Sequence, residues 1–250
     1  MPDFSWQGVY QGDLQRFYSL IVVPIAFLAW RFAARTDVRR AEVPEAASFV
    51  AGLTLFFAFE TMLDPWMTGP FIDRAGLGNG FVATLIPLAF VLLGDLRVLL
   101  LAIGVARPER SLGRNLSWAF LTSLAVPIFA GGTHALARTV WPDIHPQTLW
   151  MLYESGFFVL CVVLSRRWLP RALGSGDGNP LEASRIGFLR AVFGYSAAYY
   201  ALWWFADLLI VVGNLDLGWA VRMVPNQLYY AFWVPFVHVR FFSARPEYRV

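Results

Sequence analysis

The sequence predicts an all-α integral membrane protein: a polytopic bundle of seven transmembrane helices, with the N-terminus outside and the C-terminus in the cytoplasm. The first observation is composition, since 58% of the 250 residues are hydrophobic and 15% are charged, whereas a soluble domain carries roughly 25% charged residues. The second is a set of apolar runs that reach the roughly 20 residues a helix needs to cross a bilayer. Their polar residues occur singly rather than as the stripe of a surface helix, and they lack the alternation of a membrane β-barrel.

The spans are expected in order along a single transmembrane domain, residues 1–250. They are approximately 17–34, 46–68, 81–105, 115–136, 148–168, 187–212 and 218–241. The stretch GSGDGNPLEAS, residues 174–184, is rich in glycine, proline and serine and is expected to be a loop between spans five and six. Tryptophan is common where membrane helices meet the headgroups. It marks the outer ends at Trp6, Trp66, Trp141, Trp150 and Trp219, and the inner ends at Trp30, Trp118 and Trp168.

The distribution of arginine sets the predicted orientation. The chain has no lysine, so all 20 of its basic side chains are arginines. Cytoplasmic loops of membrane proteins carry an excess of basic residues, which favours the inner membrane of a bacterial-type cell with these arginines inside: Arg31, Arg35, Arg39, Arg40, Arg107, Arg110, Arg114, Arg166, Arg167, Arg171, Arg185, Arg190, Arg240, Arg245 and Arg249. On the other side are Arg16, Arg74, Arg138 and Arg222. Arginines at helix ends suit contacts with membrane lipids, so no nucleic-acid partner is expected.

Two carboxylates lie inside the second span, in the stretch FFAFETMLDPWMTGP at residues 56–70. Glu60 and Asp64 are four residues apart and therefore share one helix face. Counted from the outer end of the helix, Asp64 is about 6 Å deep and Glu60 about 12 Å deep. Pro65 lacks the N–H that would bond to the carbonyl of Thr61, and a kink there would turn Glu60 toward the interior of the bundle.

Other spans bring polar groups to the same outer layer. By the same count, Glu154 is about 9 Å deep, Asp207 about 7 Å, Arg222 about 5 Å and Asn226 about 10 Å. Ionisable groups in hydrocarbon are costly unless paired or hydrated, and they usually mark function. Four acids cannot all pair with one arginine, so the layer is expected to be water-filled, to hold protonated acids or to hold a cation. We expect Glu60 to lie within one water of Glu154, Asp207 or Asn226.

The alternative for this layer is purely structural. Arg222 would then bridge Asp207 or Glu154, and Asp64 would sit at the headgroups. Glu60 is the residue that such a scheme explains least well.

Aromatic side chains of spans six and seven are expected to form the floor of an outward-facing acidic cavity. Aromatic rings beside acids suit an organic cation. Half of these rings could instead face lipid, because adjacent residues cannot point the same way. The predicted floor comprises Tyr199, Tyr200, Trp203, Tyr229, Tyr230 and Trp233, and the predicted ligand site takes Tyr199, Trp203 and Tyr230 from it.

A second polar group is predicted near the cytoplasmic ends of spans three and seven. It consists of Asp95 and Arg97 in VLLGDLRVLL and His238 in FVHVRFF. Asp95 and Arg97 are two residues apart, so they point in different directions on a helix. Arg97 could snorkel to the interface. Asp95 is expected to pair with His238 or Arg240, as a structural ion pair rather than a gate.

No cofactor is predicted. A retinal Schiff base needs a lysine, and the chain has none. Haem is not expected, because His134 and His238 fall on opposite sides of the membrane and His145 lies in a loop. A metal-dependent intramembrane lipid hydrolase is a weaker alternative, with no HExxH motif to support it. Its ligands would come from Glu60, Asp64, His134, Glu154 and Asp207.

These patterns favour transport or binding of a small cationic or amphipathic ligand, with proton coupling as its extension. A membrane sensor or complex subunit without its own substrate is the main alternative, ahead of the lipid hydrolase. The identity of the ligand, the catalytic residues of any enzyme and the oligomeric state do not follow from the sequence.

Overall fold

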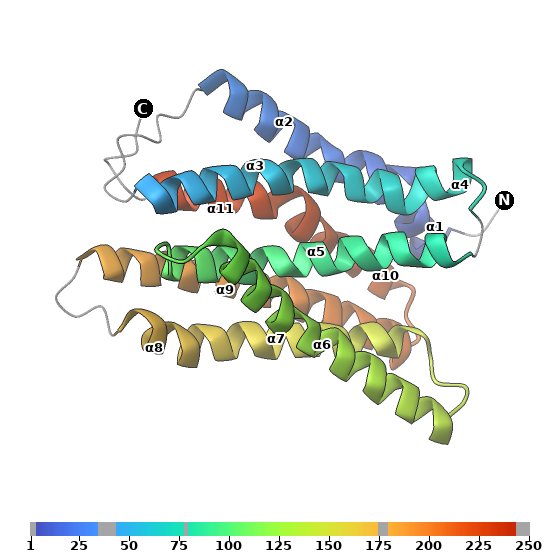
Figure 1. The fold of residues 1–250 in the computed structure, drawn as a ribbon. Coiled ribbons are helices and arrows are strands. Elements are labelled where there is room, and N and C mark those ends of the chain that lie inside the picture. Colours follow the sequence, from blue (N-terminus) through green and yellow to red (C-terminus); the bar gives the residue numbers. More distant parts are fainter. Residues whose placement is uncertain (1–3, 35–43, 78–79, 175–179, 244–250) are drawn as a thin grey trace. The chain divides into compact units, whose positions relative to one another are not determined.

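The structure, a computed structural model, describes residues 4–34, 44–77, 80–174 and 180–243. Every regular element in these ranges is a helix, and none is a strand (Figure 1). The predicted all-α class is confirmed. Some sequence predictions fall outside the described residues, namely those for residues 175–179 of the predicted loop and for Arg35, Arg39, Arg40, Arg245 and Arg249. The loop prediction is wrong for residues 180–184, because helix α9 (Pro180–Val211) already begins at Pro180.

The chain forms two compact units. The first, here called the N unit, is Arg16–Phe120 with Tyr230–Val250, and the second, here called the C unit, is Met1–Gln15 with Leu121–Tyr229. Helix α6 (Leu112–Val140) begins in the N unit and continues into the C unit. A π-helical segment, Gln227–Phe232, returns the chain to the N unit.

Within the N unit, helix α3 packs against three other helices, α2, α5 and α11. Apolar residues on several faces of α3 and α5 supply its core, including Val50, Phe57 and Leu101, each at most 2% exposed. Helix α3 continues through Pro65 into a π-helical turn, Met67–Phe71, and the short helix α4 (Ile72–Arg74). The other elements are α2 (Ser19–Ala34), α3 (Pro44–Trp66), α5 (Phe81–Ala106) and α11 (Trp233–Ser243).

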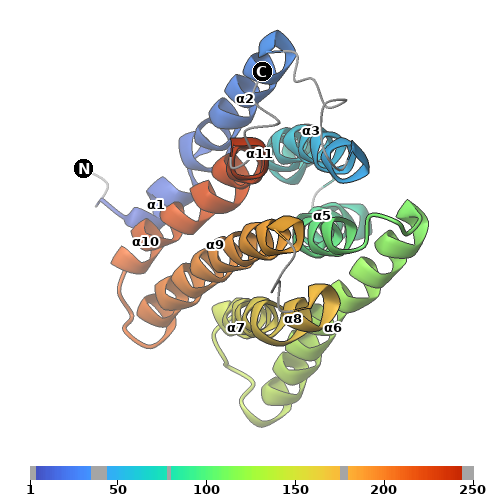
Figure 2. The same ribbon diagram turned by 90° about the vertical axis from the view of Figure 1, so that its left-hand side faces the viewer.

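Within the C unit, helix α9 packs between α7 and α10, as the end-on view shows (Figure 2). The short helix α1 packs on α10. Helix α7 passes through a π-helical turn, Leu164–Trp168, into α8 (Leu169–Leu173). The remaining elements are α1 (Trp6–Gln11), α7 (Gln147–Val163), α9 (Pro180–Val211) and α10 (Leu217–Asn226).

A tight turn joins α9 to α10 and brings the two helices into close contact. Asn214 occupies the left-handed region with φ 48°, which asparagine tolerates better than most residues. Gly218, near the start of α10, has no room for a side chain: a Cβ there would lie 2.7 Å from the carbonyl oxygen of Ala206 and 2.6 Å from a side-chain carbon of Ile210. This close approach directs the next turn of α10, which carries Arg222, against α9.

Asp216, in the same turn, ties α1 to α10. Its carboxylate accepts hydrogen bonds from the backbone N–H of Trp6 and of Gln7, and from the hydroxyl of Ser5. The first N–H groups of a helix have no partner within the helix, so an acceptor here stabilises α1. The hydrogen bond from the Trp6 backbone, followed by those from Gln7 and Ser5, lowers the pKa of the Asp216 carboxyl below its usual value.

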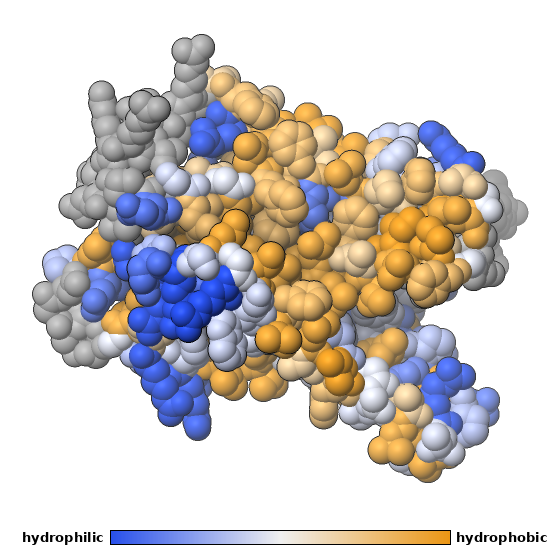
Figure 3. Space-filling model, viewed as in Figure 1, coloured by the Kyte–Doolittle hydropathy of each residue, from blue (hydrophilic) through white to orange (hydrophobic). Residues whose placement is uncertain are grey.

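Five helical stretches of the described chain are long and apolar enough to cross a membrane: Leu14–Ala33, Glu45–Arg74, Phe81–Ala106, Leu112–Val140 and Gln147–Leu173. They match the first five predicted spans. Many large hydrophobic side chains on them are exposed, for example Phe56, Phe59 and Leu63 on α3. Figure 3 shows extensive hydrophobic surface on one face of the protein. Exposed apolar surface of this extent suits contact with lipid and supports a multi-pass membrane protein.

The last two predicted spans are not among these five. Helix α9 is long enough, but the middle of it contains Tyr and Trp where the other spans carry aliphatic residues. The seventh predicted span is divided among α10, the π-helical segment and α11. Seven spans therefore remain a proposal, whereas five are supported by length and composition.

Candidate functional site

The polar residues predicted to form one outer layer belong to two different units. Glu60 and Asp64 lie in the N unit, whereas Glu154, Asp207, Arg222 and Asn226 lie in the C unit. Each group is organised around its own arginine. The predicted approach of Glu60 to Glu154, Asp207 or Asn226 stays a prediction.

In the C unit, Arg222 of α10 lies between two carboxylates from neighbouring helices. Its guanidinium contacts Asp207 of α9 and lies 3.6 Å from Glu154 of α7, measured from Nη1 to Oε1. Asp207 is fully buried, Glu154 is 3% exposed and Arg222 is 8% exposed. The helix pairs α7–α9 and α9–α10 thus place two acids and one base in a common interior site.

The two carboxyl groups also lie close to each other. Glu154 and Asp207 are within hydrogen-bonding reach through their side chains. Two ionised carboxylates cannot hydrogen-bond, because neither has a donor. Among the described residues, Oε2 of Glu154 and Oδ2 of Asp207 are buried and receive no hydrogen bond. One proton held between the two groups would supply the missing donor and leave the group of three with no net charge.

Hydrogen bonds extend this site to the N-terminal helix and to the aromatic side of α9. The hydroxyl of Tyr10 accepts from Nε of Arg222 at 3.4 Å and from Nδ2 of Asn226 at 3.2 Å. The indole N–H of Trp203 donates to Oδ1 of Asn226 at 2.8 Å. On the opposite side, Gln147 donates to Asp207 at 3.3 Å. We call the set Glu154, Asp207, Arg222, Asn226 and Tyr10 the acid-pair site.

Aromatic rings pack beside the acid-pair site in a continuous cluster. Tyr199 contacts Tyr200, Trp203 and Tyr229 with ring centroids 4.6–5.5 Å apart. Both Tyr199 and Tyr200 are buried, at 0% and 2% exposure, whereas Trp204 is 38% exposed. The predicted alternation of inward and outward rings therefore applies to Trp203 and Trp204, and not to the two tyrosines. The other two predicted floor residues, Tyr230 and Trp233, belong to the N unit.

In the N unit, Arg97 of α5 is the basic counterpart of the acids on α3. It acts electrostatically on both Glu60 and Asp64, which are 6% and 4% exposed. Its guanidinium lies 4.6 Å from the centre of the Trp233 ring, a cation–π contact with α11. Arg97 is fully buried, so the expectation that it snorkels to the interface is wrong: the acids of α3 and the ring of α11 hold it inside.

The two acids of α3 have different surroundings. The hydroxyl of Thr68 donates to the backbone carbonyl oxygen of Asp64 at 2.8 Å, and the Tyr230 side chain is within hydrogen-bonding reach of the Asp64 carboxyl. Glu60 lies deeper along the same face, and its Oε2 atom is buried without a hydrogen bond among the described residues. Asp95 acts on Glu60 as a further negative group. The buried group of Glu60, Asp64, Asp95 and Arg97 in the N unit thus also contains more acids than bases.

His238 has partners other than the one expected from the sequence. Its Nδ1 lies 3.3 Å from the hydroxyl of Thr54, and its ring contacts those of Phe27, Trp30 and Phe242. It is 1% exposed. His238 is therefore packed among aromatic rings in the N unit. The predicted pairing of His238 with Asp95 stays a prediction.

Two of the residues considered for a metal ion, Glu154 and Asp207, lie close together in the C unit. His134 is half-buried on α6, and its Nε2 atom is buried without a hydrogen bond in the described part of the chain. Within the described ranges, no group of three or more His, Cys, Asp or Glu side chains could hold a metal ion.

Two residues that contact the site's charged groups, Tyr10 and Gln147, were not predicted from the sequence. Tyr10 lies on a six-residue helix before the first span, and Gln147 lies at the start of α7. Neither has a local pattern that marks it. Only the packing of α1 on α10, held by Asp216, brings Tyr10 to Arg222.

Comparisons with known proteins add no assignment. No protein-family model matches the chain, and no curated protein and no solved structure matches it.

Proposed function

We propose that this protein is a seven-span membrane protein that binds a small organic cation, or a cationic amphipathic molecule, and exchanges it for a proton. The proposed activity is transport of this cation across the membrane, coupled to the exchange for a proton. The observation that carries the proposal is the acid pair of Glu154 and Asp207 around the single guanidinium of Arg222.

The charge of the acid-pair site supports an exchangeable positive charge. With both acids ionised, the group carries one negative charge in excess, and burying such a charge is costly. A proton on the acid pair removes the excess. A bound cation removes it equally well, so cation and proton compete for one site. Competition of this kind couples the binding of one to the release of the other.

The aromatic neighbours support an organic rather than an inorganic cation. Tyr10 already has a cationic partner, since the guanidinium carbon of Arg222 lies 5.8 Å from its ring centre. Rings of Tyr and Trp attract ammonium and guanidinium groups through the negative faces of their π systems. The cluster of Tyr199, Trp203 and Tyr229 beside the acids offers further faces of this kind.

The proposed topology places the N-terminus outside and the C-terminus in the cytoplasm of a bacterial-type inner membrane. Helix α9 and the stretch from α10 through α11 are the sixth and seventh spans. The arginines at the ends of the helices give this orientation by the positive-inside rule. The acid-pair site then lies in the outer half of the membrane, near the end of α9.

Thermal unfolding of the purified protein with added cations tests the proposal. We expect tetraalkylammonium or guanidinium-containing compounds to raise the unfolding temperature of the wild type, because a ligand that binds only the folded state stabilises it. The variant Asp207→Asn should lose this response. Arg138→Gln is the control, since Arg138 is exposed at the far end of α6. No shift across amines, sugars and lipids would favour a sensor or complex subunit instead.

A further inference from the structure

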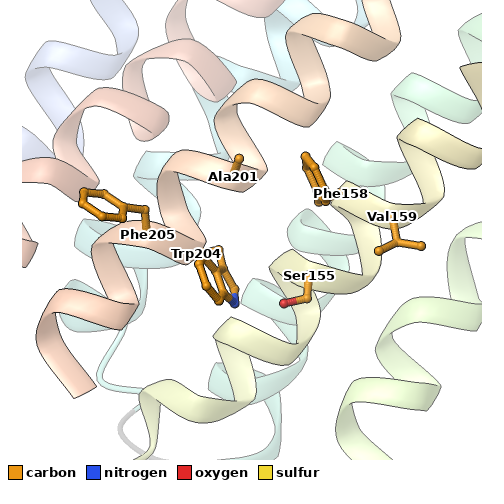
Figure 4. Close-up of a pocket in the computed structure, with 6 residues that line it drawn as sticks. All are labelled: Ser155, Phe158, Val159, Ala201, Trp204 and Phe205. Atoms are coloured by element: carbon orange, nitrogen blue, oxygen red, sulfur yellow. The ribbon is translucent and has the colours of Figure 1, made fainter. Parts of the chain in front are cut away.

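A pocket of about 520 Å³ lies between α7 and α9, and no residue of the acid-pair site lines it. This volume is within the range of about 300–1,000 Å³ that is typical of ligand pockets. Figure 4 shows the residues that line it, with Trp204 of α9 and Ser155 of α7 facing each other between the two helices. Its lining is formed by Ser155, Phe158, Val159, Ala201, Trp204 and Phe205.

The chemistry of the pocket fits a hydrocarbon chain. Ser155 supplies a hydroxyl, but this group already donates to the carbonyl oxygen of Met151 at 2.7 Å. The large apolar residues around the pocket, such as Val159 and Phe205, are exposed at 55% and 47%. In a membrane, residues that are exposed in this way face lipid. The pocket therefore opens toward the acyl chains.

A row of small, exposed residues continues from the pocket along α9, and we call the pocket together with this row the α7–α9 groove. Ala198 and Gly194 follow Ala201 toward the start of the helix and are exposed. A Cβ added at Gly194 would meet nothing within 4 Å. The groove is therefore open on this side.

Two exposed arginines lie where this groove leads. Arg190 is three helical turns, or about 16 Å, from Ala201 on the same face of α9. Arg166 lies at the corresponding end of α7, two turns beyond Val159. Among the described residues, neither arginine is paired with a carboxylate. The distance from the pocket to Arg190 is close to half the roughly 30 Å thickness of a bilayer's hydrocarbon core.

We propose that the α7–α9 groove binds an anionic phospholipid, with one acyl chain in the pocket and the phosphate against Arg166 and Arg190. The charge of the arginines selects an anionic headgroup. The spacing between the arginines and the pocket matches a lipid whose chain reaches the middle of the membrane. The inference requires α7 and α9 to lie in the membrane, and it does not depend on cation binding at the acid-pair site.

A second copy of this chain is a less suitable occupant. Small residues do allow close packing of membrane helices. A copy with the same orientation in the membrane, however, would bring its own Arg190 to the same depth. Like charges would then oppose the contact, whereas a phosphate is attracted.

Quenching of tryptophan fluorescence by brominated acyl chains tests the proposal, because Trp204 lines the pocket. The protein is reconstituted in phosphatidylcholine vesicles that contain increasing brominated phosphatidylglycerol or brominated phosphatidylcholine. The difference between wild type and Trp204→Phe isolates the signal of Trp204. We expect brominated phosphatidylglycerol to quench this signal at a markedly lower mole fraction than brominated phosphatidylcholine.

Variants separate the two parts of the site. Arg190→Gln should reduce the preference for phosphatidylglycerol about fivefold, whereas Arg138→Gln should leave it unchanged. Ala201→Phe should fill the pocket and reduce quenching by either lipid. Equal quenching by the two brominated lipids in the wild type would overturn the proposal. A Trp204 signal that neither lipid quenches would also overturn the proposal. Crosslinking that then shows a second copy of the chain in the groove would identify the occupant in that case.

Discussion

Removing the guanidinium of Arg222 is the change that most directly probes the acid-pair site. Arg222→Gln leaves Asp207 and Glu154 buried without their shared cation, and Tyr10 without one of its two donors. Removing one partner of a buried ion pair typically destabilises a protein by about 3–5 kcal/mol, because the remaining charge is uncompensated. We expect a loss in this range at neutral pH.

The same reasoning predicts a much smaller effect for Glu154→Gln. This substitution removes the excess acid and leaves Asp207 paired with Arg222, so the expected loss is about 1 kcal/mol or less. Both variants remove a charged group from the acid-pair site. Their expected effects differ because Arg222→Gln leaves two acids without a base, whereas Glu154→Gln leaves one acid paired with one base.

Lower pH should reduce the cost of Arg222→Gln. Protonation of Asp207 and Glu154 removes the negative charge that Arg222 neutralises, so the difference from wild type should shrink as the pH falls. The assay is denaturant unfolding in mild detergent, followed by tryptophan fluorescence, with Arg138→Gln expected within about 0.5 kcal/mol of wild type as an exposed control. The reasoning is refuted if Arg222→Gln is as mild as this control, or if Glu154→Gln costs as much as Arg222→Gln.

Three further predictions concern the frame around the site. The N–H groups at the start of α1 lower the pKa of Asp216. The stabilisation of α1 by the Asp216 carboxylate should therefore be complete above the unfolded pKa of about 3.9, and it should be lost as the pH falls through the pKa of the folded state. Hydrogen exchange at α1 should increase as the pH falls through that value, and it should be increased at any pH in Asp216→Asn. Gly218→Ala should cost about 1–3 kcal/mol of unfolding free energy, because the new Cβ meets the carbonyl oxygen of Ala206, and unchanged stability would contradict this contact. A cysteine at Ser175, with Cys161 removed, should resist an impermeant thiol reagent in intact cells, and labelling there would reverse the proposed orientation.

The fold class and the first five spans could be predicted from the sequence because lipid imposes a simple condition on length and apolarity. Helix α9 shows where that condition weakens. Its tyrosines and tryptophans are less apolar than aliphatic residues, yet Tyr199 and Tyr200 are among the most buried side chains. Interior aromatic packing and lipid exposure leave similar patterns in a sequence, so the sixth and seventh spans stay predictions.

The acids could be found from the sequence because charges are rare in apolar runs, but their partners could not. Depth along a helix placed Glu154, Asp207 and Arg222 at similar levels, and the packing of α9 between α7 and α10 brings them together. Arg97 was misjudged for the same reason. Its flexible side chain was expected to reach the interface, whereas the ring of Trp233, distant in the sequence, holds it inside.

Calorimetric titration of the purified protein with a tetraalkylammonium ion tests the central claim most directly. Repeating the titration in two buffers of different ionisation enthalpy gives the number of protons released on binding. The account predicts that the wild type releases about one proton per cation bound near neutral pH, since cation and proton compete for one buried negative charge. It also predicts that Glu154→Gln, which removes the shared proton, releases none. Cation binding without proton release in the wild type, or equal release in Glu154→Gln, would contradict the exchange of cation for proton at the acid pair.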